Sequence, residues 1–373
     1  MAELLVLGAS FVGMSFAIAA HKEGFDVHLY DKANQPLVEN KRAANVIAVN
    51  LRSADFLKQI GVWELIPNEF VTPYRRMSVF DGEGSGSISF GSDEVGAPCL
   101  GFIVDQTALR LAMNDCAISE GLKIRWGERA NPDSDQAALL VAADGVNSET
   151  RERLGLKKIG YSYDQRATVC IAEFSKKFGD ETGSHAYQWF RSSGPLALLP
   201  IAAQNKFAVV WSSSEDMVSK TEKAFMLDLE DATEHKLGRV ARISARNSVP
   251  LVQQHALQYV APGVVLLGDA AHAIHPLAGQ GANLGFADAI CLVTELCAAR
   301  LEGRSLRDLG VLKRYERKRR KENYLAGVAM EGFHRIFTTN LSLIGVMRSV
   351  SLRLFNDNRA LKRLAIHIAS GHF

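Results

Sequence analysis

Several features that mark other classes of protein are absent from this sequence. The five cysteines are odd in number, lie far apart and include no C-x-x-C pair, which argues against a disulfide framework and a cysteine zinc site. Free thiols in a reducing cytoplasm explain them better. The net charge is only +2, and no basic stretch is interleaved with aromatic residues, so nothing indicates a nucleic-acid partner.

A long apolar run is also lacking. Leu4–Ala20 is free of charge over 17 residues, which is short for a membrane span, and it contains Gly8 and Gly13. Glu3 precedes it in place of a positive region, which argues against a signal peptide. We interpret this run as a buried strand followed by a helix and, in the absence of a targeting segment, expect a cytoplasmic protein.

The rest of the composition is that of a globular chain. Of the 373 residues, 47% are apolar and 23% are charged, and this length is typical of about two domains. The first residues predict a βαβ unit: a strand at Leu4–Leu7, a helix at Ser15–Glu23 that Gly24 ends, and a strand at Val27–Tyr30. Two helices and a buried strand follow, at Ser53–Ile60, Thr107–Glu120 and Leu139–Ala142.

From about Ala167 the pattern changes to short β-rich runs separated by polar turns, which predicts an antiparallel sheet. Val264–Leu267 is then another buried strand, after which the chain is helical to its end. The runs that we expect to form the sheet are Ala167–Phe174, Ala186–Phe190, Leu196–Pro200 and Phe207–Ser212.

The first motif, GASFVG, runs from Gly8 to Gly13 between the first strand and the first helix. In the G-x-G-x-x-G fingerprint the glycines permit a tight turn, the approach of a pyrophosphate and close helix packing, and the helix N-terminus faces the phosphates. Asp31 follows Gly8 by 23 positions, where a carboxylate can hold ribose hydroxyls. Ser10 stands where a glycine is expected. An ordinary βα turn without a ligand is the alternative.

The second motif, LVAADGVNS, spans Leu140–Ser148 and is followed by Arg151. A strand that ends in Asp144 and Gly145 near a helix start can place polar groups beside a cofactor. A type I turn with a capped helix is the alternative, which Asp-Gly alone would favour.

The third motif is the strongest. Gly268 and Asp269 end a strand at the edge where doubly wound folds bind ligands, so Asp269 can accept hydrogen bonds from sugar hydroxyls. Gly279–Gly281 opens a helix whose N–H groups and dipole can face an anion, and Asp288 follows. The nearby pair His272 and His275 has no third ligand at metal-site spacing, so we predict no metal and a structural role for both histidines.

In this order the three motifs resemble the class A FAD-dependent monooxygenases, the para-hydroxybenzoate hydroxylase type. The C-terminal third resembles the ubiquinone-biosynthesis hydroxylases, the UbiH/UbiI/UbiF family, in LAGQGANLGFADA, KRYERKRRKEN, AMEGFHRIF and ALKRLAIHIASG. Leu196–Ile201, LALLPI, matches a substrate-side strand of that family. Two features depart from the pattern: Ser10, and the short segment Gly127–Ala138, where the family usually has an additional β-meander.

The resemblance implies an α/β fold in which a Rossmann-like FAD-binding domain is interrupted by an antiparallel β-sheet substrate domain and followed by a helical C-terminal region. The implied boundaries are residues 1–160 and 263–325 for the FAD-binding domain, 161–262 for the substrate domain and 326–373 for the helical region.

The implied activity is FAD-dependent hydroxylation of an aromatic ring with NAD(P)H and O2, through a flavin hydroperoxide, on a polyprenylated phenol in ubiquinone biosynthesis. Because the chain has a single Rossmann-like motif, NAD(P)H is expected to visit the flavin transiently as a co-substrate. Another flavoenzyme of this fold, acting on a soluble phenol or an isoprenoid, and a non-catalytic flavin-binding scaffold of a quinone-synthesis complex stay open as alternatives.

The flavin carries the chemistry, so we name no side chain as catalytic. Asp144 and Arg151 are the candidates for contact with NAD(P)H. The residues expected to bind FAD are Gly8, Ala9, Ser10, Phe11, Val12, Gly13, Asp31, Lys32, Arg42, Asp144, Gly268, Asp269, Pro276, Gly279, Gly281, Ala282 and Asn283.

The residue pattern of the C-terminal region indicates a surface that contacts a membrane or a partner protein. Apolar residues recur there at helical spacing, and basic residues outnumber acidic ones beyond Thr338. This stripe either packs on the protein's own core or meets the inner membrane face or a quinone-synthesis complex, and the sequence does not decide between them. The stripe consists of Leu343, Met347, Val350 and Leu354.

Overall fold

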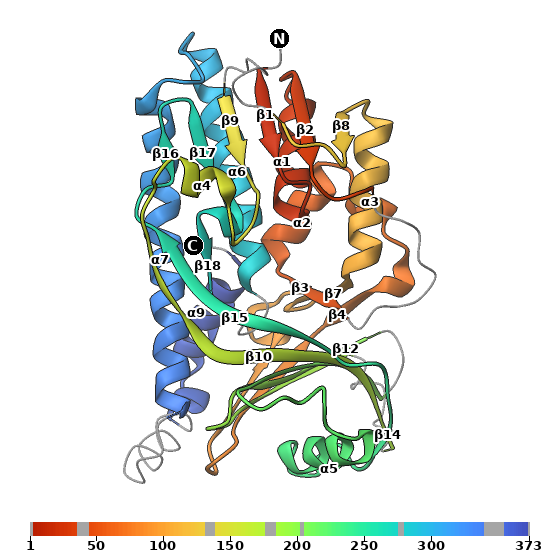
Figure 1. Ribbon diagram of the computed structural model, residues 1–373. Coiled ribbons are helices and arrows are strands. Elements are labelled where there is room, and N and C mark those ends of the chain that lie inside the picture. The colour runs from red at the N-terminus through yellow and green to blue at the C-terminus, as the bar shows by residue number, and fades with distance from the viewer. Residues whose placement is uncertain are drawn as a thin grey trace.

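The computed structural model describes residues 3–35, 45–130, 139–175, 184–201, 205–274, 280–338 and 354–371. Its architecture is mixed α/β, with a six-stranded sheet and a nine-stranded sheet at opposite ends and helices beside the first (Figure 1). A small three-stranded sheet, β3-β7-β4, lies between them (Figure 1). The strands of this small sheet are β3 (Val46–Val49), β4 (Val71–Tyr74) and β7 (Gly101–Asp105).

The six-stranded sheet has the strand order β16-β17-β9-β1-β2-β8 and is parallel except for β16. Its central strands are short runs of Leu, Val and Ala that are almost completely buried, as expected for a parallel sheet covered on both faces. The strands are β1 (Leu4–Leu7), β2 (Val27–Asp31), β8 (Lys123–Trp126), β9 (Leu139–Ala142), β16 (Val260–Ala261) and β17 (Val264–Leu266).

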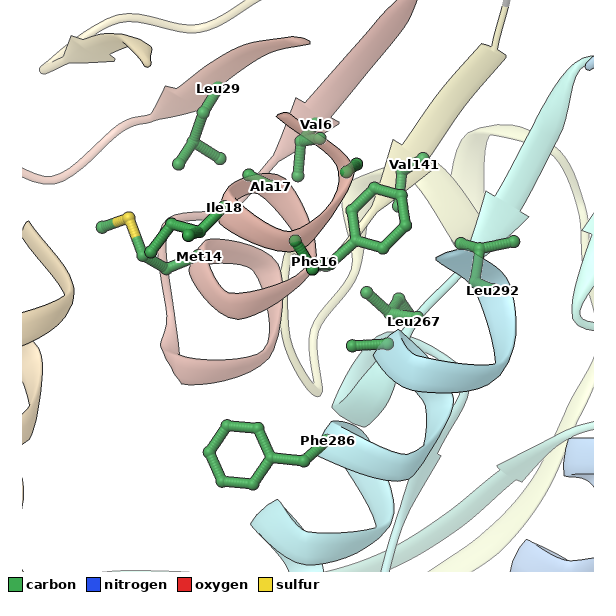
Figure 2. Close-up of a cluster of buried hydrophobic side chains, with 14 of the residues drawn as sticks. Val6, Met14, Phe16, Ala17, Ile18, Leu29, Val141, Leu267, Phe286 and Leu292 are labelled. Atoms are coloured by element: carbon green, nitrogen blue, oxygen red, sulfur yellow. The ribbon is translucent and has the colours of Figure 1, made fainter. Parts of the chain in front are cut away.

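Helix α1 lies in the core of this half, packed against α3 and α6. Figure 2 shows Phe16 of α1 pointing toward Val141 of β9 and Leu267, and all three side chains are buried. Residues 13–20 of α1 are all buried, so the helix has no polar face along this stretch. The helices of this half are α1 (Phe11–Lys22), α2 (Leu51–Gln59), α3 (Gln106–Ser119), α4 (Glu149–Arg153), α6 (Gln280–Leu301) and α7 (Leu309–Thr338).

The nine-stranded sheet has the order β18-β15-β10-β13-β12-β11-β5-β6, with β14 paired to β10. Helix α5 (Glu222–Ala232) belongs to the same core, where Phe225 packs against Trp211. The strands are β5 (Arg76–Asp81), β6 (Ser87–Gly91), β10 (Lys158–Phe174), β11 (His185–Phe190), β12 (Leu196–Pro200), β13 (Lys206–Ser213), β14 (Val240–Ile243), β15 (Asn247–Ala256) and β18 (His272–Ala273).

Two strands of this sheet, β5 and β6, come from an earlier part of the chain than the sequence analysis assigned to it. β5 pairs with β11 in parallel, so the expectation of a purely antiparallel sheet is corrected at this pair. The other pairs are antiparallel, as expected.

The predicted strands Leu4–Leu7, Leu139–Ala142 and Leu196–Pro200 are confirmed with the same bounds. The first helix begins at Phe11, four residues earlier than predicted, because the chain turns helical directly after Ser10. Gly24, Gly61 and Gly121 follow the first three helices with φ of +82°, +80° and +73°, in the left-handed region that glycine adopts at helix ends.

The C-terminal part of the described chain ends in α9 (Arg359–Ala369), which contacts η3. Within the described residues, no helix combines the length and apolarity needed to cross a membrane. Leu343, Met347 and Val350 of the predicted stripe lie outside those residues. The short 3-10 helices are η1 (Trp63–Leu65), η2 (Asn68–Phe70), η3 (Ser92–Val95) and η5 (Gly268–Ala270).

Candidate cofactor site

A cleft with a volume of about 540 Å³ opens at the carboxyl ends of β1, β2 and β9. The chain runs from β1 to β2 on one side, whereas β9 lies on the other, so the strand order reverses here. Ligands of doubly wound sheets bind at such a switch point. The residues that line the cleft are Leu7, Gly8, Ser10, Tyr30, Asp31, Lys32, Glu128, Arg129, Ala130, Ala143, Asp144, Gly145, Glu149, Thr150 and Arg153.

The turn after β1 requires glycine at both ends of the first motif. Gly8 has a φ of +100°, and a Cβ atom there would lie 2.3 Å from the carbonyl oxygen of Ala143. A Cβ atom on Gly13 would lie 1.9 Å from the carbonyl oxygen of Gly8. The first motif therefore brings β1, β9 and α1 closer together than any side chain would allow.

Asp31 fixes this turn from the end of β2. Its Oδ2 accepts a hydrogen bond from the backbone N–H of Ala9 at 2.6 Å, and its Oδ1 accepts one from Ala33 at 2.7 Å. Ser10 precedes α1 and is exposed, and its hydroxyl does not cap the helix. Ser10 thus lines an opening beside the N-terminus of α1 that suits a phosphate or a ribose.

Exposed charged residues form the rim of the cleft. Glu149 accepts hydrogen bonds from Lys32 at 3.3 Å and from Arg129 at 2.7 Å. Lys32 and Arg129 together lower the pKa of Glu149. Lys32 therefore lines the cleft, and its ammonium group forms an ion pair with Glu149.

Asp144 lies on the opposite wall. Its Oδ2 accepts a hydrogen bond from the N–H of Thr150 at 3.1 Å, whereas its Oδ1 is buried and has no hydrogen-bond partner among the described residues. A buried acceptor without a partner is costly, so this oxygen favours a bound hydroxyl or N–H donor.

The third motif meets the side chain of Val12 in the first motif. A Cβ atom on Gly268 would lie 3.2 Å from Val12, and one on Gly285 would lie 2.3 Å from it. Val12 is thus enclosed by two glycines that lie more than two-thirds of the chain away in sequence. This contact sets the distance between the turn after β1 and the N-terminal half of α6.

The Gly-Asp turn and the start of α6 are open to a ligand. Asp269 is exposed at the surface of the turn. Desolvation by the surrounding protein nevertheless raises the pKa of its carboxyl group. Helix α6 is described from Gln280, and a Cβ atom on Gly281 would meet no atom of the described residues outside its own helix turn within 4 Å. Ala282 is half-buried against the core, and Phe11 packs under the guanidinium of Arg110. Arg42, Pro276 and Gly279 lie outside the described residues.

Asn283, one of the residues predicted to bind FAD, uses its side chain within the protein. The side chain is buried and bonded to the protein backbone. Its Nδ2 donates to the carbonyl oxygen of Ala48 at 2.8 Å, and its Oδ1 accepts from the N–H of Asn50 at 3.0 Å. Asn283 therefore positions the first turn of α6 against β3 and α2.

A buried network around Asp288 holds this end of the site together. Asp288 is completely buried and accepts hydrogen bonds from the N–H of Gly268 at 3.2 Å, Arg319 at 2.7 Å and Asn323 at 3.0 Å. His272 Nε2 lies 2.5 Å from its Oδ2. Burial alone would raise the pKa of Asp288, but His272 and Arg319 hold it well below its usual range.

The sequence analysis noted Asp288 without assigning it a role, and it missed Arg319 and Asn323. The spacing of buried residues in α7 could have identified both side chains. Val311, Tyr315, Arg319 and Asn323 recur every four residues and are all buried. An arginine and an asparagine that continue an apolar helical stripe predict a buried polar partner.

Comparison with known proteins matches this arrangement. The family described as an FAD binding domain covers residues 132–324. The chain is 31% identical to the 3-demethoxyubiquinol 3-hydroxylase of Escherichia coli (strain K12), an alignment that spans 99% of this chain and 98% of that protein. It therefore belongs to the FAD-dependent hydroxylases of ubiquinone biosynthesis.

Two further similarities agree with this membership. The human protein named ubiquinone biosynthesis monooxygenase COQ6, mitochondrial, is 29% identical over 99% of this chain and 92% of its own length. The crystal structure of p-nitrophenol 4-monooxygenase PnpA from Pseudomonas putida DLL-E4 has the same fold, with a TM-score of 0.78 and 17% identity over 100% of this chain and 98% of that one.

The residues of this hydroxylase fit FAD. The cleft at the switch point offers Asp31, Ser10 and the N-terminus of α1 to the adenosine and diphosphate half. The unpartnered Oδ1 of Asp144, the exposed Asp269 and the open space at Gly281 supply acceptors and room for the remainder. The predicted FAD cofactor is confirmed by the family, whereas the individual contacts stay predictions.

Arg151 of this hydroxylase, a predicted contact of NAD(P)H, is bonded within the protein. Its side chain is 1% exposed, and its guanidinium donates to the carbonyl oxygens of Val146 and Ala270, both at 2.9 Å. Arg151 thus joins the second motif to the third by hydrogen bonds, and its contact with NAD(P)H stays a prediction.

Proposed function

We propose that this protein hydroxylates the aromatic ring of an apolar, polyprenylated phenol on the route to ubiquinone, using FAD, NAD(P)H and O2. The observation that carries the proposal is the convergence of three motifs on one site through Val12, Arg151 and Asp288. Similarity over nearly the whole chain to a protein named 3-demethoxyubiquinol 3-hydroxylase supports this substrate class.

When bound, FAD supplies the redox chemistry by accepting a hydride from NAD(P)H and activating O2. The residues of the chain bind and orient it. Asp31 and the N-terminus of α1 hold the adenosine and diphosphate end, and Asp269 accepts hydrogen bonds from sugar hydroxyls. The N-terminus of α6 offers N–H groups and a positive dipole end to negative charge at the reacting end.

The proposal includes a peripheral location at a membrane or in a quinone-synthesis complex, through the C-terminal region. A prenylated phenol partitions into lipid, so an enzyme that acts on it gains from binding where the substrate is concentrated. The cleft of the cofactor site is lined by residues around the six-stranded sheet and by no residue of α9. Helix α9 could therefore make such a contact without blocking the cleft.

The test is oxidation of NAD(P)H by the FAD-loaded protein, with and without a prenylated phenol. We expect faster oxidation with the phenol and a product heavier by one oxygen atom in mass spectrometry. Stimulation by soluble phenols alone would favour a different substrate class, and protein that stays colourless after addition of FAD would contradict the cofactor assignment itself.

A further inference from the structure

The longest described helix, α7, runs along one side of the molecule, and its outward face begins with unpaired cations (Figure 1). Lys313, Arg317 and Lys321 recur every four residues and are exposed. None of their side chains forms an ion pair or a hydrogen bond with another described residue. By contrast, Lys318 lies on the side of α7 that faces α6 and pairs there with Glu295 at 2.6 Å.

Apolar side chains continue the same face of α7. Tyr324, Leu325 and Val328 are 50%, 56% and 49% exposed. Tyr324 and Val328 follow Lys321 by about one and two turns of the helix, so they lie in line with the cations. A surface helix of a globular protein ordinarily turns such residues toward its core and exposes only polar ones.

Strand β10 extends this apolar surface beside α7. Its residues Ile159 and Tyr161 are 49% and 43% exposed. Ile159 pairs with His255 of β15, so their side chains share one face of the sheet, and the ring of His255 packs edge-on against that of Tyr324 with centroids 5.6 Å apart. Tyr161 is hydrogen-bonded to Glu331 of α7. We call the exposed apolar residues of this surface the outer patch: Ile159, Tyr161, Tyr324, Leu325 and Val328.

The acidic residues of α7 do not offset the cations of its outward face. Each of them is already bonded within the protein, to a backbone N–H, to a buried arginine or to a tyrosine hydroxyl. The outward face of α7 therefore has a positive charge and attracts anions. The three acidic residues of the helix are Glu316, Glu322 and Glu331.

We propose that this face of α7 docks the protein on an anionic lipid surface, with the outer patch at the boundary of the acyl chains and Arg317 and Lys321 against the lipid phosphates. Long basic side chains reach the headgroups while their apolar neighbours lie deeper, and tyrosine suits the interface because its ring is apolar and its hydroxyl polar. A nucleic acid would match the cations but would leave Leu325 and Val328 without an apolar partner. The proposal rests on the proposed function for its purpose, which is access to an apolar substrate.

The same turns of α7 contact the cofactor site on their inner side. Arg319 and Asn323 are buried and donate to Asp288, which also accepts a hydrogen bond from the N–H of Gly268. Lys321 lies on the outer side of these turns. Because an α-helix with its side chains is about 10–12 Å across, the docked face is roughly one helix diameter from this network. Docking through α7 therefore brings the third motif close to the lipid from which an apolar substrate comes.

The test is flotation of the full-length, FAD-loaded protein with vesicles of phosphatidylcholine, alone or mixed with phosphatidylglycerol. We expect binding to the mixed vesicles and a loss on the order of tenfold in K321Q/L325Q, because one phosphate contact and one inserted side chain are removed. The matched control is K223Q/L227Q on α5, which packs on the nine-stranded sheet. Lys223 and Leu227 are exposed and have the same spacing, so both variants change the net charge equally. The control should bind like the wild type.

The outcomes separate the docking proposal from the proposed function. FAD content and oxidation of NAD(P)H with a short-chain, water-soluble phenol are measured on the same samples, and both should be unchanged in K321Q/L325Q. Equal vesicle binding by wild type and K321Q/L325Q, or none by either, overturns the docking proposal while leaving hydroxylation intact. An equal loss in K223Q/L227Q would reduce the binding to nonspecific charge attraction and would also overturn it. A loss of binding confined to K321Q/L325Q, in a protein that forms no hydroxylated product, would support docking and contradict the proposed function.

Discussion

The two ends of the cofactor site are built on different principles. At the proposed adenosine end, an open cleft is shaped by backbone turns at Gly8 and Gly13, and its charges, such as Lys32 and Glu149, are exposed. At the proposed flavin end, the Gly268 turn is held by a completely buried carboxylate, Asp288, and the groups bonded to it. The shape of the first end depends on backbone turns that leave no room for a Cβ atom, whereas the second end depends on buried charges that must remain paired. Substitutions at the two ends should therefore change the free energy of unfolding by different amounts.

Asp288→Asn should have the largest effect. It leaves the buried guanidinium of Arg319 without its main counter-charge and weakens the bond to His272, so the free energy of unfolding should fall by about 3–5 kcal/mol. Urea denaturation of the FAD-free protein measures this loss. Glu149→Gln, which removes a fully exposed charge at the other end, is the control and should leave the denaturation midpoint unchanged. Equal urea denaturation midpoints for the two variants would contradict the conclusion that only the second end depends on paired buried charges.

Asp269→Ala and Ser10→Gly compare the two ends for binding. Asp269 should lose charge-assisted hydrogen bonds to sugar hydroxyls, at a cost of about 1.5–3 kcal/mol in the free energy of FAD binding. Ser10→Gly restores the usual glycine fingerprint and should change FAD affinity little. Titration of the apoprotein with FAD measures both. An equal or larger loss in Ser10→Gly would show that the Gly-Asp motif has been given the wrong role.

Gly285→Ala and Gly281→Ala distinguish packing from cofactor access within one helix. A Cβ atom at position 285 would overlap Val12, so we expect a loss of about 1–3 kcal/mol in the free energy of unfolding. A Cβ atom at 281 meets none of the neighbouring side chains or turns that the structure describes, so folding should be unaffected while FAD affinity falls. Thermal unfolding without FAD, combined with FAD titration, separates the two results. Normal FAD affinity in Gly281→Ala would exclude close approach of the cofactor there.

His255 should give the smallest effect, a pH dependence confined to the buried network. Burial, together with the nearby His272 and Arg320, lowers the pKa of His255 from 6.5 to about 4. The unfolded chain therefore binds a proton that the folded protein rejects between these values. The stabilisation is complete above pH 6.5 and is lost as the pH falls toward 4. Urea midpoints measured across this window should fall less steeply in His255→Gln than in the wild type, and identical slopes would contradict the assignment.

How far the sequence predicts this fold depends on how its strands are buried. β1, β9 and β12 are short apolar runs in the core, and their bounds follow directly from composition. β5 and β6 were not assigned to this sheet although their polar and apolar side chains alternate, because the partner of β5 in the sheet, β11, lies about a hundred residues later. Pairing over such a distance leaves no local pattern.

The candidate site divides in the same way. Glycine turns such as Gly8 and Gly268 are visible in sequence because their positive φ angles strongly favour glycine. The bonds that Asn283 and Arg151 make within the protein were not visible, because an amide or a guanidinium can serve a ligand or the backbone equally well. Only the folded structure shows that both side chains are bonded to carbonyl or N–H groups of the chain. Side-chain chemistry alone therefore does not distinguish a cofactor contact from a bond within the protein.

The position of Val12 between Gly268 and Gly285 has a consequence for biosynthesis. The nucleotide turn at the beginning of the chain gains the wall that carries Asp144 during translation, but it meets the third motif only after α6 has left the ribosome and folded onto it. The newly made protein therefore completes its FAD site only late in synthesis and folding. When riboflavin is scarce, chains should complete synthesis, fail to be locked by their cofactor, and be degraded as apoprotein.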